Sequence, residues 1–309
     1  MRRFFANIFI LIFYATMSYG QSVPFLNYFS DARAAAMGNT GYALSSSFSV
    51  QRNTAAIMSD FAPVTDVGAS YLLWQPQVAN SNLIQVAGYT KLKNLGVSAG
   101  VRYHTQSEIR YADEHGNPTG SFTPKEYALE IGLAYKINAN ISAGATLRNI
   151  SSDMNGSKKG SSTAADISML YSRENLNFGL GITNLGSKVS YGYYKYDLPA
   201  RVQAGVAYRL LNNDKNSVTG AVDAAYQLAS SNSGVVAGLG VEYTYNNLIS
   251  LRTGYHTDGK AIGVSYATVG FGVHVSGLSV DLAYALASSD NPMRQTLIVS
   301  LSWGIMDKK

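Results

Sequence analysis

One pattern recurs along nearly the whole chain after residue 63: apolar residues alternate with small or polar ones over nine or ten positions. Residues 278–286 (LSVDLAYAL) show it clearly, with Leu, Val, Leu, Tyr and Leu at every second position and Ser, Asp, Ala and Ala between them. Successive side chains of a β-strand point to opposite faces, so this segment has one apolar face and one small, polar face. A soluble β-sandwich strand can look the same, but this repetition is typical of a transmembrane β-barrel, whose strands run about 9–11 residues.

The alternation predicts an all-β fold, a transmembrane β-barrel of about fourteen antiparallel strands, an even number as in bacterial single-chain barrels. The strands are expected at residues 64–74, 81–90, 95–104, 125–135, 141–151, 163–172, 176–185, 200–210, 217–227, 234–245, 248–255, 266–275, 278–287 and 295–304. After the second strand, every other connection is short, and those between are mostly longer. Because such barrels have short periplasmic turns and longer external loops, both termini are expected in the periplasm.

Charged residues within the predicted strands share the phase of the small polar residues and are therefore expected to face the lumen. They are Arg102, Glu130, Arg148, Asp166, Arg201, Arg209, Asp223, Glu242, Arg252 and Asp281. An arginine on the lipid face near the midplane would cost about 2–4 kcal/mol, which explains this phase. The lumen is either a packed, ion-paired interior or a polar pore, and we favour ion pairing because unpaired buried charge is costly.

The first twenty residues differ from the rest. Arg2 and Arg3 precede an apolar run at residues 4–14, and residues 18–20 (SYG) place small residues at the −3 and −1 positions of a cleavage site. This arrangement predicts a secretory signal peptide over residues 1–20. The sequence contains no cysteine, which excludes a lipid anchor on cysteine, disulfides and thiolate metal sites.

Residues 21–62 do not alternate and are too apolar for a free linker. We interpret them as a plug or hatch at the periplasmic mouth of a barrel formed by residues 63–309. Asp31 is a plausible N-cap for a short helical turn over residues 32–37, and Gly38 is placed to end it. The plug residues expected to matter are Phe25, Leu26, Arg33, Met37 and Gly38.

The sequence gives little support for an active site, a metal site or a nucleic-acid-binding surface. Residues 96–100 (GVSAG) match the G-x-S-x-G pattern of hydrolases, but Ser98 lies in mid-strand with no helix after it, so we expect no enzyme and no cofactor. The four histidines share no metal-ligand spacing, although weak calcium binding by the loop around His115 stays open. Charged residues make up 14% of the chain and form no basic cluster with aromatics, so nucleic acid is not an expected partner.

The connection at residues 186–199 (GSKVSYGYYKYDLP) carries four tyrosines, Tyr191, Tyr193, Tyr194 and Tyr196. Tyrosine brings a large contact area with little loss of entropy and is favoured at interfaces. This connection is therefore either a partner-binding external loop or a loop that folds back over the barrel mouth. The sequence favours neither alternative.

Several motifs resemble the PorV/PorQ family, whose relatives include the FadL-type fatty-acid transporters. The best marker is VPFL at residues 23–26 followed by DARAAAMGNTG at residues 31–41. Further similarities are TNLGSKVSY at residues 183–191, VEY at 241–243 and RTGY at 252–255. The sequence departs from the family where residues 53–55 read Asn-Thr-Ala instead of the common Asn-Pro-Ala, which frees the backbone of Thr54.

The resemblance implies a fourteen-stranded, FadL-like barrel in the bacterial outer membrane, in contact with its lipid, with an N-terminal hatch. For PorV-like members it also implies work in type IX secretion, in which the barrel receives cargo through a C-terminal signal domain and passes it to a surface attachment complex or translocon. The alternative is a FadL-like channel for hydrophobic small molecules. The inward positions are mostly Gly, Ala, Ser, Thr and charges, which favours protein binding or a purely structural role over an apolar path.

Signal-peptide cleavage gives the first testable prediction. The mature chain should begin at Gln21 and fractionate with the outer membrane, because residues 1–20 have the charged, apolar and small-residue regions of a cleaved leader. Intact-mass analysis of the purified protein measures this directly. Retention of Met1, or recovery in the soluble periplasm, would contradict it.

Overall fold

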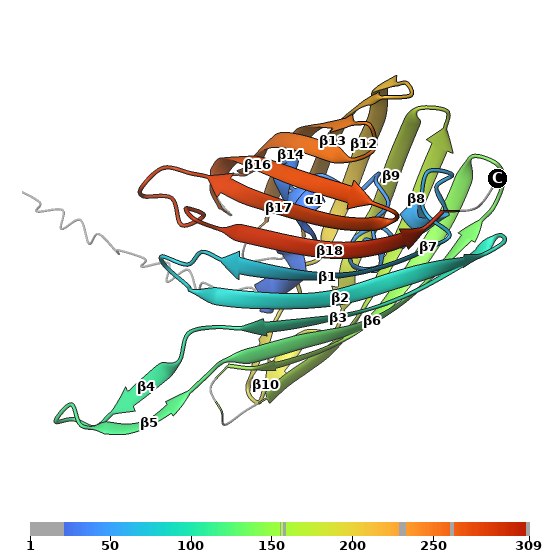
Figure 1. Cartoon of the computed structure of the whole chain (residues 1–309). Coiled ribbons are helices and arrows are strands. Elements are labelled where there is room, and N and C mark those ends of the chain that lie inside the picture. The colour runs from blue at the N-terminus through green and yellow to red at the C-terminus, as the bar shows by residue number, and fades with distance from the viewer. Residues whose placement is uncertain (1–21, 155, 157–158, 229–232, 260–262, 307–309) are drawn as a thin grey trace, which may run out of the picture.

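Fourteen long strands close into a single barrel in the computed structural model, which describes residues 22–306 apart from 155, 157–158, 229–232 and 260–262 (Figure 1). The barrel strands are β1 (Thr65–Trp74), β2 (Ser81–Leu92), β3 (Leu95–Thr105), β6 (Lys125–Lys136), β7 (Ile141–Asp153), β8 (Lys159–Arg173), β9 (Leu176–Gly186), β12 (Arg201–Asn212), β13 (Asn216–Gln227), β14 (Gly234–Tyr245), β15 (Ile249–Asp258), β16 (Ser265–Val275), β17 (Leu278–Leu286) and β18 (Leu297–Ile305). The predicted signal peptide, residues 1–20, lies outside the described residues.

Every neighbouring pair in the barrel is antiparallel, and β1 pairs with both β2 and β18, which closes the sheet. The predicted fold and number of barrel strands are confirmed. The largest difference is in β8, expected at residues 163–172 but extending from Lys159 to Arg173. Its first residues pair with the end of β7, from Asp153 opposite Lys159 onward. They are mostly small and polar, so the hydrophobic pattern did not mark them.

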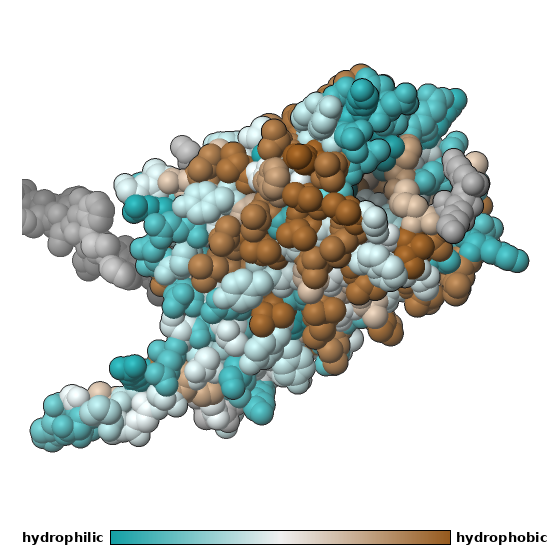
Figure 2. Space-filling view, in the orientation of Figure 1, coloured by the Kyte–Doolittle hydropathy of each residue, from teal (hydrophilic) through white to brown (hydrophobic). Residues whose placement is uncertain are grey.

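The outer wall is apolar because the strand period assigns one face of each strand to lipid. In β17, Leu278, Val280 and Leu282 are 43%, 42% and 42% exposed, whereas Ala283 and Ala285 are each 3% exposed. Figure 2 shows apolar residues gathered across the middle of the wall, with hydrophilic residues toward the ends and on the projecting hairpin. This distribution is that of a barrel in a membrane. No helix in the described part of the chain is long and apolar enough to cross a membrane.

The segment before β1 fills the lumen, where Figure 1 shows it in blue inside the barrel. It contains four short helices, η1 (Pro24–Asn27), α1 (Ala32–Ala36), η2 (Ser49–Gln51) and η3 (Thr54–Met58). Helix α1 packs on β15 to β18, and η3 packs on β6 to β8. Most side chains of the segment are buried, so it is a core for the barrel as well as a plug.

The two rims of the barrel differ in their connections. Short turns form one rim, which we call the short-turn rim; they lie at residues 93–94, 137–140, 174–175, 213–215, 246–248 and 276–277. The opposite rim, the long-connection rim, carries two hairpins outside the barrel sheet. These are β4 (Ile109–Ala112) with β5 (Pro118–Phe122), and β10 (Val189–Tyr191) with β11 (Tyr194–Tyr196). The β4–β5 hairpin projects well beyond the barrel (Figure 1).

The two ends of the described chain lie at different rims, whereas the connection lengths led us to expect both termini at the short-turn rim. The barrel itself begins and ends at the short-turn rim, where Thr65 pairs with Ile305. The described chain, however, starts at the long-connection rim, where the Ser22 backbone N–H donates to the Asp197 carbonyl at 3.4 Å. The plug runs the length of the lumen before β1 begins, and this path separates the two ends.

The assignment of faces gives a prediction for two adjacent residues of β18. Leu301 is 48% exposed on the outer wall, whereas Ser302 lines an internal polar cavity of about 370 Å³. Leu301→Arg should lower the free energy of unfolding by about 2–4 kcal/mol, the cost of an arginine near the midplane. Ser302→Arg should cost less, because its guanidinium enters a polar space. Denaturant unfolding in lipid vesicles compares them, and equal losses would contradict the assigned faces.

Candidate functional site

Phe25 and Leu26 lie in η1 and are 0% and 4% exposed. They belong to an apolar cluster that also contains wall residues such as Leu72, Leu83 and Ile150. The backbone carbonyl of Leu26 accepts a hydrogen bond from Arg102 Nη1 at 2.7 Å. Both side chains therefore pack against the wall and line no apolar channel through the plug.

Arg33 joins α1 to the strands. Asp31 caps the helix, accepting from the Ala34 N–H at 2.8 Å, and this fixes the direction in which Arg33 points. Arg33 donates from Nε and Nη2 to the two carboxylate oxygens of Glu242, at 2.9 and 2.7 Å. The negative charge of Glu242 raises the pKa of Arg33 above its ordinary value. Arg252 donates to the same carboxylate at 2.6 Å and to Asp281 at 2.6 Å.

Met37 and Gly38 form the tight turn after α1. Met37 is fully buried, and Gly38 has φ +73°, a conformation that favours glycine. A Cβ at Gly38 would meet the Tyr255 carbonyl oxygen and would come within 2.6 Å of the Leu239 carbonyl oxygen. The Gly38 N–H donates to Thr268 Oγ1 at 3.0 Å. The plug backbone thus lies directly against the barrel wall at this turn.

A second ionic network crosses the opposite side of the lumen. Glu130 forms salt bridges with Arg102 at 2.8 Å and with Arg148 at 2.5 Å. Arg148 also forms one with Asp166 at 3.0 Å. Arg148 also donates to the side-chain oxygen of Asn184. All these side chains are nearly inaccessible to solvent. The strand charges named here therefore form a packed, ion-paired interior, the alternative that the sequence favoured.

The four tyrosines of the β10–β11 hairpin separate into two pairs. Tyr191 and Tyr196 are half-buried and stack edge to face, with ring centroids 5.9 Å apart. Tyr193 and Tyr194 are 94% and 69% exposed at the tip. Val189, at the base, is fully buried in the apolar cluster. The loop both folds back on the mouth and presents aromatic side chains outward, so each of the two alternatives describes half of it.

A chain of contacts connects this hairpin to the plug, and sequence reasoning did not identify it. The Tyr191 hydroxyl donates to Ser152 Oγ at 2.6 Å, and Ser152 donates to Glu126 at 2.7 Å. Glu126 lies 3.0 Å from His104 Nδ1, and the His104 ring stacks on Phe25 with centroids 5.6 Å apart. His104 and Glu126 are directly opposite in β3 and β6. Glu126 is also directly opposite Ser152 in β7, so the pairing of three neighbouring strands brings His104, Glu126 and Ser152 together.

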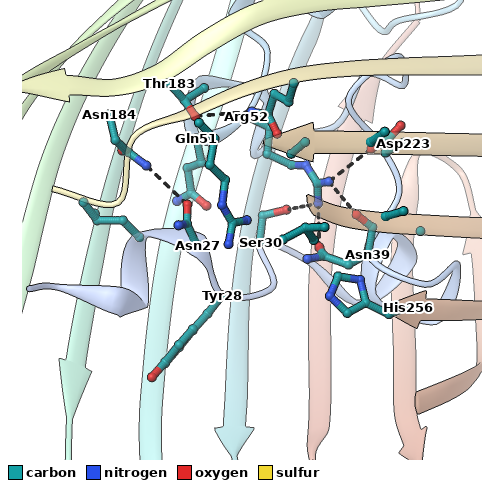
Figure 3. Close-up of a pocket in the computed structure, with 18 of the residues that line it drawn as sticks. Asn27, Tyr28, Ser30, Asn39, Gln51, Arg52, Thr183, Asn184, Asp223 and His256 are labelled. Atoms are coloured by element: carbon teal, nitrogen blue, oxygen red, sulfur yellow. Dashed lines mark hydrogen bonds and ion pairs between the residues drawn. The ribbon is translucent and has the colours of Figure 1, made fainter. Parts of the chain in front are cut away.

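A cavity of about 260 Å³ lies at the long-connection rim, and we call it the long-connection vestibule. Its lining combines aromatic and apolar side chains with a cation, among them Tyr28, Trp74, Tyr266, Met293 and Arg201. Arg201 donates from Nε and Nη2 to Gln227 Oε1, at 3.3 and 3.1 Å. The vestibule adjoins a smaller cavity against the plug, and Figure 3 shows Arg52 among the residues that line it.

The arrangement gives no support to catalytic or metal chemistry. Ser98 is buried within β3, and its hydroxyl donates to the Gly132 carbonyl at 3.3 Å. Asp113, in the loop of His115, accepts from the backbone N–H groups of His115 and Asn117 at 2.9 and 2.8 Å and so closes a local turn. Among the described residues no three His, Asp or Glu side chains gather as a metal site.

The sequence matches a family model described as type IX secretion system protein PorV, over residues 16–232. The chain belongs to the PorV family. The match covers more than two thirds of its length, from before the plug to the loop after β13. The predicted family is thereby confirmed. The family is that of a secretion system component, and together with the β-barrel it places the chain in the outer membrane. No curated protein matches the sequence.

Solved structures show where this PorV-family barrel belongs among folds. The Pseudomonas putida toluene transporter TodX superposes with a TM-score of 0.61 at 14% identity, covering 91% of this chain and 99% of that one. The Ralstonia pickettii toluene transporter TbuX gives 0.57 at 14% identity, covering 89% and 98%. A Pseudomonas aeruginosa FadL homologue gives 0.54 at 11% identity, covering 89% and 98%. At these identities the likeness concerns the fold alone, which is FadL-like.

The close contact between Gly38 and the barrel wall gives a testable prediction. Gly38→Ala should destabilise the barrel by about 1–2 kcal/mol from its left-handed backbone alone, and by more because the new methyl group meets wall carbonyls. The measurement is denaturant unfolding of the variant in lipid vesicles. Gly116→Ala is a matched control, since Gly116 also has a positive φ but faces open space. A Gly38 variant no less stable than this control would contradict the close plug–wall contact.

Proposed function

We propose that this PorV-family barrel binds secreted cargo or a partner protein of type IX secretion at the long-connection rim and passes it to surface attachment. The observation that supports this most is the exposure of Tyr193 and Tyr194 on a hairpin whose other two tyrosines are anchored. Membership of a family described as a type IX secretion system protein supports a role in secretion. The connection lengths support an orientation with this rim at the cell exterior and the short-turn rim in the periplasm.

The hairpin suits binding because its conformation is fixed before a partner arrives. The hydrogen bond from Tyr191 to Ser152 holds the hairpin to the mouth, and the salt bridge between Lys188 and Asp197, at 3.0 Å, joins its two flanks. A preorganised loop loses less conformational entropy on binding than a mobile one. Aromatic anchors at the centre of an interface contribute about 2 kcal/mol or more each.

The β4–β5 hairpin offers a second contact at the same rim. It is a two-stranded sheet separate from the barrel sheet, and Ile109 and Tyr111 are 44% and 42% exposed on it. The edge of such a sheet presents backbone groups that an extended peptide can pair with. Together with the exposed tyrosines, this edge fits a protein partner better than a small solute.

Replacing the exposed tyrosines tests this proposal. Tyr193→Ala with Tyr194→Ala should weaken capture of a secreted protein that carries a type IX C-terminal signal domain, by about 2 kcal/mol or more per true anchor. Binding is measured by pull-down and titration with the purified barrel in detergent. Heat-modifiable mobility on gels should stay unchanged, because both side chains lie outside the barrel core.

A matched control is the pair Tyr135→Ala with Tyr245→Ala, two residues that are 54% and 47% exposed near the short-turn rim. These changes should leave capture intact. Equal binding by the Tyr193 and Tyr194 variant and the unchanged barrel would refute the proposed surface. Equal weakening by both double variants would show that the effect is not specific to the hairpin.

The second candidate is a channel for hydrophobic small molecules, and the long-connection vestibule favours it. Tyr28, Trp74, Tyr266 and Met293 give that cavity an apolar part, and two similar structures are of toluene transporters. Phe25 and Met37, however, are packed against the wall and open no apolar path beyond it. A deletion strain with normal display of secreted proteins but impaired uptake of a hydrophobic solute would favour the channel over protein binding.

A further inference from the structure

The internal cavities form a series along one side of the plug. The long-connection vestibule adjoins a cavity of about 60 Å³, and Tyr28, Asn39, Arg201 and His256 line both. From the other end, the cavity of about 370 Å³ at the short-turn rim, here called the short-turn vestibule, adjoins a cavity of about 10 Å³. That small cavity has room for about one water molecule.

Arg52 is the residue that separates the two halves of this series. It lines the cavity of about 60 Å³ on one side and the cavity of about 10 Å³ on the other, and it is the one residue common to both linings. Figure 3 shows its guanidinium between Ser30, Asn39 and Asp223. The side chain extends from the residue after η2 across the lumen to β13.

The guanidinium of Arg52 bonds mainly to neutral oxygens rather than to carboxylates, and Nη1 donates a long hydrogen bond to Ser30 Oγ at 3.5 Å. Nη2 donates to the Asn39 carbonyl at 2.8 Å, and Nη1 donates to the Asn39 side-chain oxygen at 3.0 Å. Its ion pair with Asp223 is 3.5 Å long, whereas Arg33 and Arg252 pair with Glu242 at 2.7 and 2.6 Å. Asp223 Oδ2 also accepts from two plug N–H groups at 2.8 Å, so its charge is shared.

The residues that line these cavities determine which solutes the cavities are able to hold. The short-turn vestibule contains Arg33, Asp66, Glu242, Asp281 and several serines. The cavity on the far side of Arg52 is lined mostly by polar and charged residues, including Gln51, Arg102, Asn184 and Gln203. Apolar molecules gain nothing from these surfaces, whereas water and small ions are solvated by them.

We propose that the lumen holds a closed passage for water and small ions, that Arg52 is its gate and that its pair with Asp223 holds the gate shut. The rest of the plug stays in place when the gate opens, because α1 and η3 are fixed to the wall by other contacts. This activity is separate from partner binding at the hairpins and does not depend on it.

Removing the gate side chain tests the proposal. Arg52→Ala, reconstituted into planar lipid bilayers in potassium chloride, should show a steady conductance several times that of the unchanged barrel, which should be mostly closed. Arg209→Ala is the matched control. Arg209 is also a lumen arginine, 3.5 Å from the Phe61 ring centroid, but it borders a side cavity near the short-turn rim. The Arg209→Ala barrel should keep the low conductance of the unchanged barrel.

Asp223→Asn gives a second variant that keeps the volume of the side chain and an oxygen for the plug N–H groups. It should open more often than the unchanged barrel but less fully than Arg52→Ala. If Arg52→Ala does not fold, as judged by heat-modifiable mobility, the conductance of Asp223→Asn still tests the proposed gate. A folded Arg52→Ala or Asp223→Asn barrel that conducts no more than Arg209→Ala would overturn the proposal.

Chemical modification of an introduced cysteine shows whether ions cross through these cavities. Because the chain has no cysteine, Ser45→Cys introduces a single thiol. Ser45 lines both the cavity of about 10 Å³ and the short-turn vestibule. A cationic methanethiosulfonate reagent should reduce the conductance of the Arg52→Ala, Ser45→Cys barrel and leave that of Arg52→Ala unchanged. An unaffected current in the cysteine variant would mean that ions cross elsewhere, which would also overturn the proposal.

Discussion

Glu242 lies between Arg33 of the plug and Arg252 of β15, and this triad illustrates the constraint on which the rest of the structure depends. Charges placed on the lumen face avoid lipid, but inside a filled barrel they must be paired. Removing one partner of a buried ion pair costs about 3–5 kcal/mol, since the other charge is left without compensation. The plug supplies one member of the triad and backbone acceptors elsewhere, so wall and plug are stable only together.

The strands could be predicted closely because lipid imposes a strict rule on them. Each strand alternates between a face for hydrocarbon and a face for the lumen, and the sequence carries that period directly. The prediction failed where the rule does not apply. The start of β8 is mostly small and polar, and β10 and β11 lie outside the barrel sheet, where Gly192, with φ +81°, was the one local signal of a turn.

The candidate sites were predictable as residues but not as contacts. Phe25, Arg33 and Gly38 could be singled out from a motif, yet the partners of the plug are distant in sequence, with Arg33 and Glu242 separated by 209 positions. A segment without a period carries no register, so its direction through the lumen was also hidden. The position of Ser22, the first described residue, at the long-connection rim beside Asp197 follows from packing that no local pattern records.

The attachment of the plug is uneven, and this determines where it is able to yield. The turn at Gly38 meets wall carbonyls directly, and the Arg33 and Arg102 guanidinium groups are held by short charged contacts. Arg52 instead donates to the neutral oxygens of Asn39 and Ser30 and makes one long ion pair. Local opening follows the weakest contacts of a structure rather than its average stability. A motion that connects the two vestibules therefore begins at Arg52, while the triad at Glu242 keeps α1 in place.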